Sequence, residues 1–266
     1  MITPLYGQLS PLRVPTILAP DPDALAYIAA VETADGATLE DGVKSAINNF
    51  VAGCKSDGIW SAIKSSCILA GARTLNGALV PLAGTTPTNF NFVSADYNRE
   101  TGLIGNGSTK YLNSNRAADA DPQNNASVAI WVSTPATAIN LYYMGAIKTT
   151  PTPLVVTAIA TNVAFSIRSG GNLSVSNRVG TGLAGISRTA SNSFNYRWAG
   201  ATGTSTNAPT GTYNGNIFVF GINSNGAIAS RSNGRLAFYS IGESLNLALL
   251  DTRVSNLMTA LAVAIP

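Results

Sequence analysis

The chain has 266 residues, of which 45% are apolar and only 11% are charged, and its net charge is +3. This length allows one large β domain with a sizeable core, and the dispersed basic residues do not predict a nucleic-acid-binding surface. The chain contains no histidine, which excludes catalysis by Ser-His-Asp or Cys-His groups and metal binding by imidazole. A polar surface made of Ser, Thr, Asn and Gly favours an exposed β protein that works outside a cell.

Residues 1–20 are predicted to form an extended docking arm, because prolines at positions 4, 11, 15 and 20 forbid a helix. We expect the arm to lie on its own body or, in preference, on another subunit. Its apolar contacts would come from Leu5, Tyr6, Leu9, Leu12, Val14 and Ile17. The start of the chain lacks the basic and apolar regions of a secretory signal. No apolar run reaches the roughly 18 residues of a membrane span, so no membrane insertion is expected.

Residues 21–66 are predicted to form a helical segment. Asp21-Pro22-Asp23 is a strong helix start, with an N-cap, a proline in the first turn and an acidic residue at the positive end of the helix dipole. Gly36 ends this helix. Thr38, with an acidic residue three positions later, predicts a second helix that Gly58 ends. One face of the second helix is apolar at helical spacing: Val43, Ile47, Phe50, Val51 and Cys54.

Residues 67–266 are predicted to form a β-sandwich with a closing helix, because the hydrophobic period becomes two from residue 90 onward. The strand candidates are 103–112, 126–134, 139–147, 153–160, 162–168, 172–178, 184–190, 193–199, 216–222 and 235–241. Hairpin turns are predicted at Asn214-Gly215 and at residues 169–172. The closing helix has one apolar stripe: Leu247, Leu250, Val254, Leu257 and Leu261. On that helix we expect Arg253 to be exposed.

The two cysteines, Cys54 and Cys67, are too few for a disulfide framework. Cysteine is commonly buried as a small apolar residue. Two buried free thiols are therefore preferred over a bridge.

Three segments carry a family resemblance: Gly102-Leu-Ile-Gly-Asn-Gly-Ser-Thr-Lys-Tyr-Leu, Val128-Ala-Ile-Trp-Val and Gly234-Arg-Leu-Ala-Phe-Tyr-Ser-Ile-Gly-Glu-Ser-Leu. Together they resemble the concanavalin A-like lectin/glucanase superfamily, in its laminin-G-like branch. The resemblance implies a jelly roll over about residues 90–250, with Trp131 packed in a central strand. The whole pattern also resembles modules of phage virion proteins, especially tail and fibre components.

Residues 122–242 contain no Asp or Glu but seven basic residues: Lys148, Arg168, Arg178, Arg188, Arg197, Arg231 and Arg235. Glycosidases typically need two carboxylates about 5 to 10 Å apart. The hydrolases of the resembled family carry theirs on central strands, so glycosidase activity is not expected. Asp119 and Asp121 lie in the densest cluster of oxygen ligands, but a solvated loop is preferred there over a calcium site.

Glycan-binding proteins commonly stack an aromatic ring on a sugar and add amide or guanidinium hydrogen bonds. The candidate glycan-binding residues are Tyr196, Arg197, Trp198 and Tyr213, because Phe194, Tyr196 and Trp198 alternate along one strand. Packing in the core or between subunits is the alternative for each of these rings.

The leading functional hypothesis is a non-enzymatic virion structural protein, a tail fibre or appendage whose jelly roll could contact host surface glycans. We expect no cofactor and no metal, and a homo-oligomer with a trimer favoured. The docking arm would contact other virion proteins, and the protein would be made in the host cytoplasm and reside in the virion. The alternatives are a capsid decoration (cement) protein, a free-standing lectin and, third, a glycan-cleaving enzyme.

Overall fold

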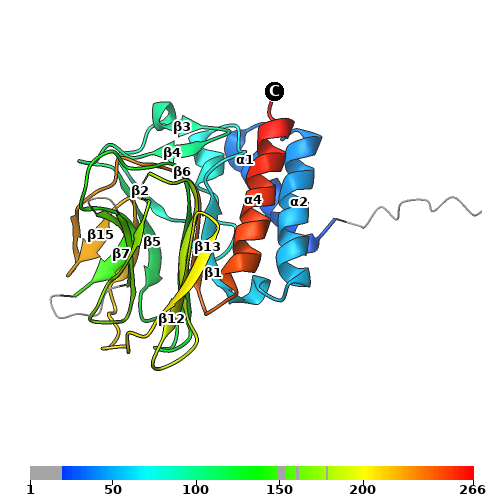
Figure 1. The fold of residues 1–266 in the computed structure, drawn as a ribbon. Coiled ribbons are helices and arrows are strands. Elements are labelled where there is room, and N and C mark those ends of the chain that lie inside the picture. The colour runs from blue at the N-terminus through cyan, green and yellow to red at the C-terminus, as the bar shows by residue number, and fades with distance from the viewer. Residues whose placement is uncertain (1–19, 149–153, 160–161, 178) are drawn as a thin grey trace, which may run out of the picture.

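The computed structural model describes residues 20–148, 154–159, 162–177 and 179–266. Two β-sheets pack face to face, and a layer of helices covers the outside of one of them (Figure 1). The docking-arm residues Leu5, Tyr6, Leu9, Leu12, Val14 and Ile17 lie outside the described residues, as does Arg178.

The sheet beneath the helices, called the helix-covered sheet, is antiparallel. Its order is β13 (Ala201–Ser205), β12 (Phe194–Trp198), β11 (Gly182–Arg188), β6 (Ala126–Thr134), β17 (Arg235–Gly242), β4 (Gly102–Ile104) and β3 (Tyr97–Asn98). β1 (Ile63–Ile68) pairs with β17 beyond the part that β4 occupies.

The second sheet, called the outer sheet, has the order β10 (Leu173–Ser176), β9 (Asn162–Ile167), β8 (Leu154–Ile159), β7 (Leu141–Ile147), β14 (Asn216–Val219), β5 (Tyr111–Ala117) and β2 (Thr88–Phe90). These strands are antiparallel, and a small hairpin of β15 (Ile222–Ser224) and β16 (Ala227–Ala229) attaches beside β7. The predicted mainly β jelly-roll sandwich with a C-terminal helix is confirmed.

The core between the sheets comes from the inward residues of both sheets. In β6, Val128, Ile130 and Val132 belong to this core, whereas Ala129 and Trp131 face the helices. Both faces of β6 are therefore packed, which explains why its sequence is almost continuously apolar. Trp131 packs as the resemblance implied.

The helical layer consists of α1 (Pro22–Asp35), α2 (Asp41–Ser56) and α4 (Leu247–Ala264). α1 begins as predicted: the carboxylate of Asp21 accepts from the amide of Asp23, and Pro22 follows the cap. It ends at Gly36, whose φ of 65° is left-handed. Short helical turns occupy Trp60–Ala62, Leu75–Ala78 (α3) and Ser94–Asp96.

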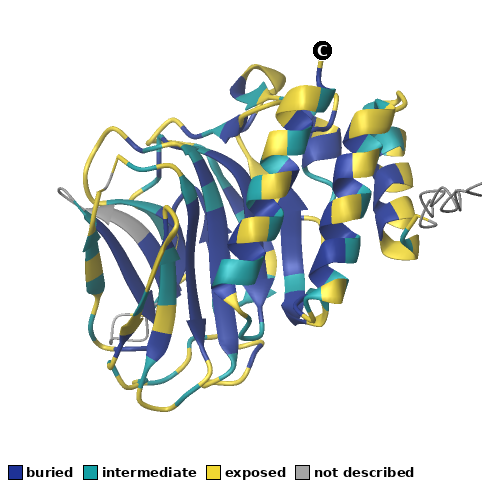
Figure 2. Ribbon diagram, turned by 45° about the vertical axis from the view of Figure 1, so that its right-hand side comes forward, coloured by how far each residue is buried: buried dark blue, intermediate teal, exposed yellow. Residues whose placement is uncertain are grey.

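The layer packs on the sheet through a second apolar core. Phe50 of α2 meets Phe238 of β17 edge to face, with ring centroids 5.7 Å apart. The sequence predicts Arg253 of α4 to be exposed. Its side chain instead donates two hydrogen bonds of 2.7 Å to Asp57. Figure 2 shows the result, with buried strands, and helices buried on one side and exposed on the other.

α4 alone among the described helices has the length and the mean hydropathy, 1.3, that could also fit a membrane span. Its leucine stripe is buried within the second core, so burial of one face against α2 and the helix-covered sheet accounts for this composition.

The predicted strand 103–112 is wrong. It is two strands in different sheets, β4 and β5, because residues 105–110 cross from one sheet to the other. The crossing needs small residues: a Cβ on Gly105 would lie 2.0 Å from the carbonyl oxygen of Ser232. The prediction of a hairpin at Asn214-Gly215 is also wrong, because β14 begins after these residues and pairs with β5 and β7. The hairpin predicted at residues 169–172 is confirmed, since this segment joins β9 to β10.

Two further predictions concern the N-terminal half. The second helix starts after Glu40, not after Thr38, because the backbone carbonyl of Thr38 accepts a hydrogen bond from Arg73 instead. β1 begins at Ile63, inside the segment predicted to be helical. Cys54 and Cys67 are both free and buried, as predicted, and burial raises the pKa of each thiol to about 12.

Candidate functional site: an aromatic and arginine surface on the outer sheet

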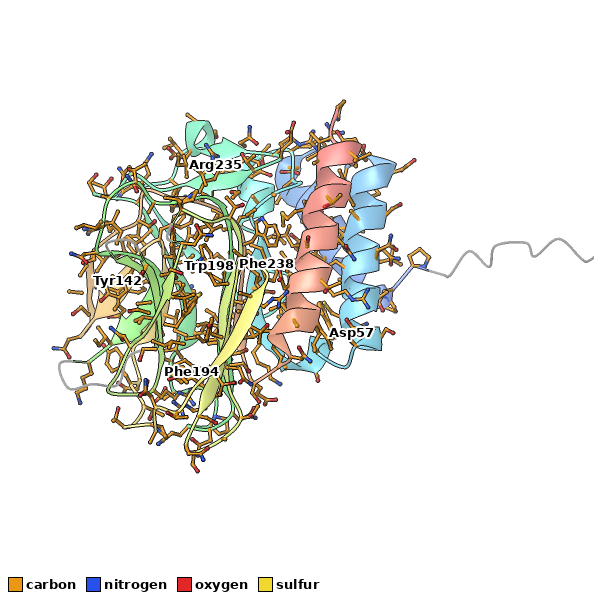
Figure 3. The ribbon with its side chains drawn as sticks, in the orientation of Figure 1. Asp57, Tyr142, Phe194, Trp198, Arg235 and Phe238 are labelled. Carbon is orange, nitrogen blue, oxygen red and sulfur yellow. The ribbon has the colours of Figure 1, made fainter. Side chains whose placement is uncertain are left out.

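The ring residues predicted from the 193–199 strand point into the sandwich. Trp198 is only 2% exposed, and its indole Nε1 donates to the carbonyl of Asn177 at 3.0 Å. Phe194 is also 2% exposed, and Figure 3 shows both side chains within the body of the protein. Tyr196, partly buried, stacks on Phe165 of the outer sheet with centroids 5.6 Å apart. These rings hold the two sheets together, and Trp198 is not accessible to a ligand.

Arg197 points to the opposite face of β12, toward the helices. Its Nε donates to the carboxylate of Asp251 in α4 at 2.7 Å, and Nη1 donates to Thr202. Tyr213 is partly buried against the core between the sheets. The four predicted residues therefore do not share one exposed face, and glycan binding by Tyr196 or Tyr213 stays a prediction.

An aromatic row lies instead on the outer face of the outer sheet. Phe90 of β2 stacks on Tyr111 of β5 with centroids 4.3 Å apart and ring planes within 4°, and Tyr111 lies 5.0 Å from Phe218 of β14. Leu112 is fully buried in the core, so the alternation of β5 turns Tyr111 toward solvent. Phe90 is 36% exposed, which leaves part of its ring open for contact, whereas Tyr111 is partly buried and Phe218 is only 7% exposed.

Arg231 completes this surface. The carbon of its guanidinium lies 5.9 Å from the centroid of Tyr111, a cation–π distance. Burial raises the pKa of Tyr111, and the positive charge of Arg231 opposes that rise. We call Phe90, Tyr111, Phe218 and Arg231 the aromatic surface.

Arg231 differs from the other described arginines of the acid-free region. Arg168 donates to the carbonyls of Ala118, Asp121 and Pro122, and Arg188 donates to carbonyls that include those of Ile167 and Asn207. Arg235 bonds to the carbonyl of Gly102, and Arg197 bonds to Asp251. Within the described part of the chain, the guanidinium of Arg231 has no hydrogen bond or ion pair, and its Nε is buried without a partner.

Polar side chains lie beside the aromatic row on the same face. Asn113, two residues after Tyr111, pairs in register with Thr88 and with Phe218. Its Oδ1 accepts from the amide of Asn115 at 2.9 Å, and no described residue accepts from its Nδ2. The surface thus offers an open ring, a guanidinium and an amide donor, which can bind a ligand.

The carboxylates nearest the sheets are already in ion pairs. Asp121 is 6% exposed and pairs with Arg116 at 2.5 Å, whereas Asp119 is exposed, so the 119–121 loop is solvated only in part. Asp96 pairs with Lys110, and Asp251 with Arg197. Within the described ranges no group of three or more Cys, Asp or Glu residues could hold a metal ion.

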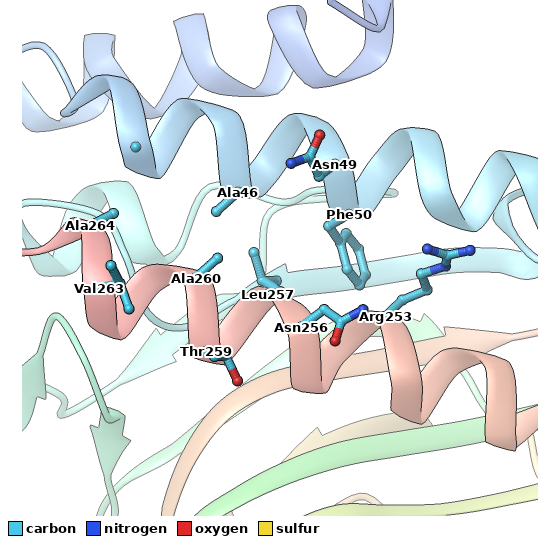
Figure 4. Close-up of a pocket in the computed structure, with 11 residues that line it drawn as sticks. Ala46, Asn49, Phe50, Arg253, Asn256, Leu257, Thr259, Ala260, Val263 and Ala264 are labelled. Carbon is cyan, nitrogen blue, oxygen red and sulfur yellow. The ribbon is translucent and has the colours of Figure 1, made fainter. Parts of the chain in front are cut away.

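The helical layer carries a different kind of surface, a groove of about 720 Å³ between α2 and α4 (Figure 4). Its lining is mainly small or apolar, with Ala46 and Phe50 from α2 and Leu257, Ala260 and Val263 from α4. Such a groove suits an apolar chain segment better than a sugar, which needs polar partners.

No protein-family model matches this chain, and no curated protein matches its sequence. Among solved structures, the binding domain of botulinum neurotoxin serotype D is similar over 73% of this chain and 51% of that one, with 12% identity and a TM-score of 0.50. This chain therefore spans about half the length of the toxin domain.

Two other similar structures match less closely. The CBM40 module of the Ruminococcus gnavus IT-sialidase, solved with α2,6-sialyllactose, matches with 14% identity over 49% of this chain and 82% of that one, at a TM-score of 0.36. Domains LG4-5 of the mouse laminin α1 chain match with 12% identity over 63% of this chain and 47% of that one, also at 0.36. The likeness is one of fold: this chain is a jelly-roll β-sandwich with a helical layer over one of its two sheets.

Proposed function

We propose that this chain is a glycan-binding module, and that the aromatic surface binds a sugar with an acidic group. The observation that carries the proposal is the guanidinium of Arg231, which lies against Tyr111 and has no hydrogen bond or ion pair to a described residue. An arginine without a carboxylate partner can bind a ligand carboxylate or sulfate through two parallel hydrogen bonds. The similarity in fold to a toxin binding domain supports binding rather than catalysis.

The chemistry of the surface suggests how such a sugar would bind. The apolar face of a sugar ring packs on the open part of Phe90, while Arg231 binds the acidic group and Asn113 donates to a hydroxyl group. Ring packing contributes about 0.5–1.5 kcal/mol, and hydrogen bonds to a charged group contribute about 1.5–3 kcal/mol. These contributions, at most about 4.5 kcal/mol before the cost of ordering the ligand, correspond to a Kd of about 0.5 mM or weaker for one site. Tight binding to a glycan-coated surface would then require several copies of this module in one assembly.

A glycan array that contains sialylated, uronic-acid and sulfated glycans beside their neutral parents tests the proposal. We expect the protein to prefer acidic glycans, and Arg231→Gln to reduce that binding by at least tenfold. Asn124→Gln, in an exposed turn, is the matched control and should bind like the parent. Absence of binding to every glycan, or equal binding by Arg231→Gln, would overturn the proposal.

The second part of the proposal is that the module works in a virion, as a tail fibre or other appendage, in a homo-oligomer with a trimer favoured. The sequence resemblance to phage tail and fibre modules supports it, and so does the apolar groove between α2 and α4. A capsid decoration protein and a free-standing lectin are the alternatives. Electron micrographs of particles labelled on this protein would show whether it lies on the head or on the tail. If the particles do not contain this protein, only the free-standing lectin would remain.

A further inference from the structure

A second groove runs between α1 and α2 beside the one in Figure 4, and Asn49 lines both. Apolar residues line it together with the polar residues Glu32, Lys44, Ser45, Asn48 and Asn49. It has a volume of about 640 Å³, and Pro20 lines it. α1 contributes Leu25, Ala29 and Glu32 to its lining, at the spacing of one helix face. Leu25 is 49% exposed, although it is a large apolar residue in the middle of this lining. The described residues therefore leave an apolar helix face open.

We infer that residues 13–19 of the same chain occupy this groove. The path of the chain is the first reason. Pro20 is itself part of the groove, and the next residue is held there because the amide of Asp21 donates to Asn48 of α2 at 2.7 Å. Lys55 of α2 also pairs with Asp21 at 2.7 Å. Residue 19 is one peptide unit, about 3.8 Å, from Pro20, so the segment starts at the groove.

Length is the second reason. Proline-rich segments adopt an extended helix that rises about 3.1 Å per residue, so seven residues span about 22 Å. α1 has 14 residues and, at about 1.5 Å per residue, is about 21 Å long. The α1 lining of the groove ends at Glu32, about 18 Å from Pro20 along the helix, so residues 13–19 are long enough to reach its far end. Pro15 and Pro20 reduce the conformational entropy that docking would cost.

Chemistry is the third reason. The segment supplies the apolar side chains Val14, Ile17 and Leu18, and Arg13 lies at its far end. Glu32 lines that end of the groove. Its Oε1 accepts from the amide of Leu39 and pairs with Lys44, and its Oε2 has no bond to a described residue. Arg13 can bond to that free oxygen.

The same chain is preferred over a second copy because the tether is short. A segment joined directly to its site has an effective concentration in the millimolar range, which exceeds the concentration of free chains in most solutions. Residues 1–12, with Leu5, Tyr6, Leu9 and Leu12, would then extend beyond the groove. The contacts of the docking arm with other subunits would come from those residues.

Disulfide trapping in the full chain tests the inference. Thr16 lies about 12 Å from Pro20 along an extended segment, and Ala29 lies about 14 Å from it along α1. The double variant Thr16→Cys/Ala29→Cys should therefore form an intramolecular disulfide at least tenfold faster than Thr16→Cys/Ala262→Cys. Ala262 is the matched control because it is an exposed alanine of α4 outside the groove. Cys54 and Cys67 stay in place because both are buried.

Each outcome decides the inference. Equal rates for the two pairs would show that the segment is not in the groove. A disulfide that joins two chains, detected as a dimer on a non-reducing gel, would assign the groove to the arm of a second copy. Adding Ile17→Asp to the first pair should slow trapping several-fold, whereas Ile2→Asp, outside the docked segment, should not.

Discussion

Glu40 provides the sharpest test of how the helical layer is attached to the sandwich. It lies at the start of α2, and its two carboxylate oxygens accept from Arg99, which follows β3, at 3.0 and 2.7 Å. Arg73 adds a second ion pair at 3.2 Å. Hydrogen bonding to Arg99 lowers the pKa of Glu40 from 4.5 to about 2.

The lowered pKa sets the size and the pH range of the effect. A shift from 4.5 to about 2 corresponds to about 3 kcal/mol of stability. The Glu40 side chain is 21% exposed, and screening by solvent reduces this to about 2 kcal/mol. Because the folded pKa is below the unfolded one, the stabilisation is complete above pH 4.5. It is lost as the pH falls through about 2.

We therefore expect Glu40→Gln to lower the free energy of unfolding at pH 7 by about 2 kcal/mol, or the Tm by about 4–8 °C. The difference from the parent should fall to less than half at pH 3. Urea unfolding followed by tryptophan fluorescence at several pH values measures both quantities. Glu100→Gln, at an exposed position nearby, is the control and should change stability by less than about 0.5 kcal/mol. A difference that stays constant from pH 7 to pH 3 would refute the role of charge.

Three other predictions separate packing from binding. Trp198→Ala should destabilise the fold by about 3–5 kcal/mol in urea unfolding. Phe90→Ala, which removes a ring stacked on Tyr111, should cost only about 1–2 kcal/mol yet weaken binding to acidic glycans on an array; equal stability losses would contradict this assignment. Gly102→Ala should destabilise by more than about 2 kcal/mol, because φ is 92° and a Cβ would lie 2.2 Å from a carbonyl oxygen of β17; an unchanged Tm would contradict it. Cys54 and Cys67 should react with a thiol reagent at pH 8 only after unfolding, since burial raises both pKa values to about 12; rapid reaction of the native protein would contradict that burial.

Local signals were sufficient for much of the fold. The cap at Asp21, the end of α1 at Gly36 and the apolar stripe of α4 each depend on residues within a few positions of one another. The crossing at residues 105–110 could not be predicted in the same way. Glycines within an apolar run are compatible with one strand or two, and only the pairing of β4 with β17 decides between them.

The position of the candidate rings relative to solvent could not be predicted, for a different reason. Alternation along residues 194–198 correctly puts three rings on one face, but it does not say which face meets solvent. β12 belongs to a sheet that is covered on both sides, so Phe194 and Trp198 face the sandwich core and Arg197 faces Asp251. The two residues of that ion pair are 54 positions apart in the sequence, and Arg231 and Tyr111 are separated by even more. Local sequence patterns therefore predict neither contact.

The lack of acidic residues in 122–242 nevertheless supports the proposed site once the structure is known. Arginines in such a region must find backbone carbonyls, distant carboxylates or an external anion. Arg168 and Arg188 are buried and use carbonyls to fix loops at the end of the sandwich. Arg235 uses the carbonyl of Gly102, which leaves Arg231 as the described arginine of this region without such a partner. The absence that argued against glycosidase activity thus becomes the reason to expect an anionic ligand at the aromatic surface.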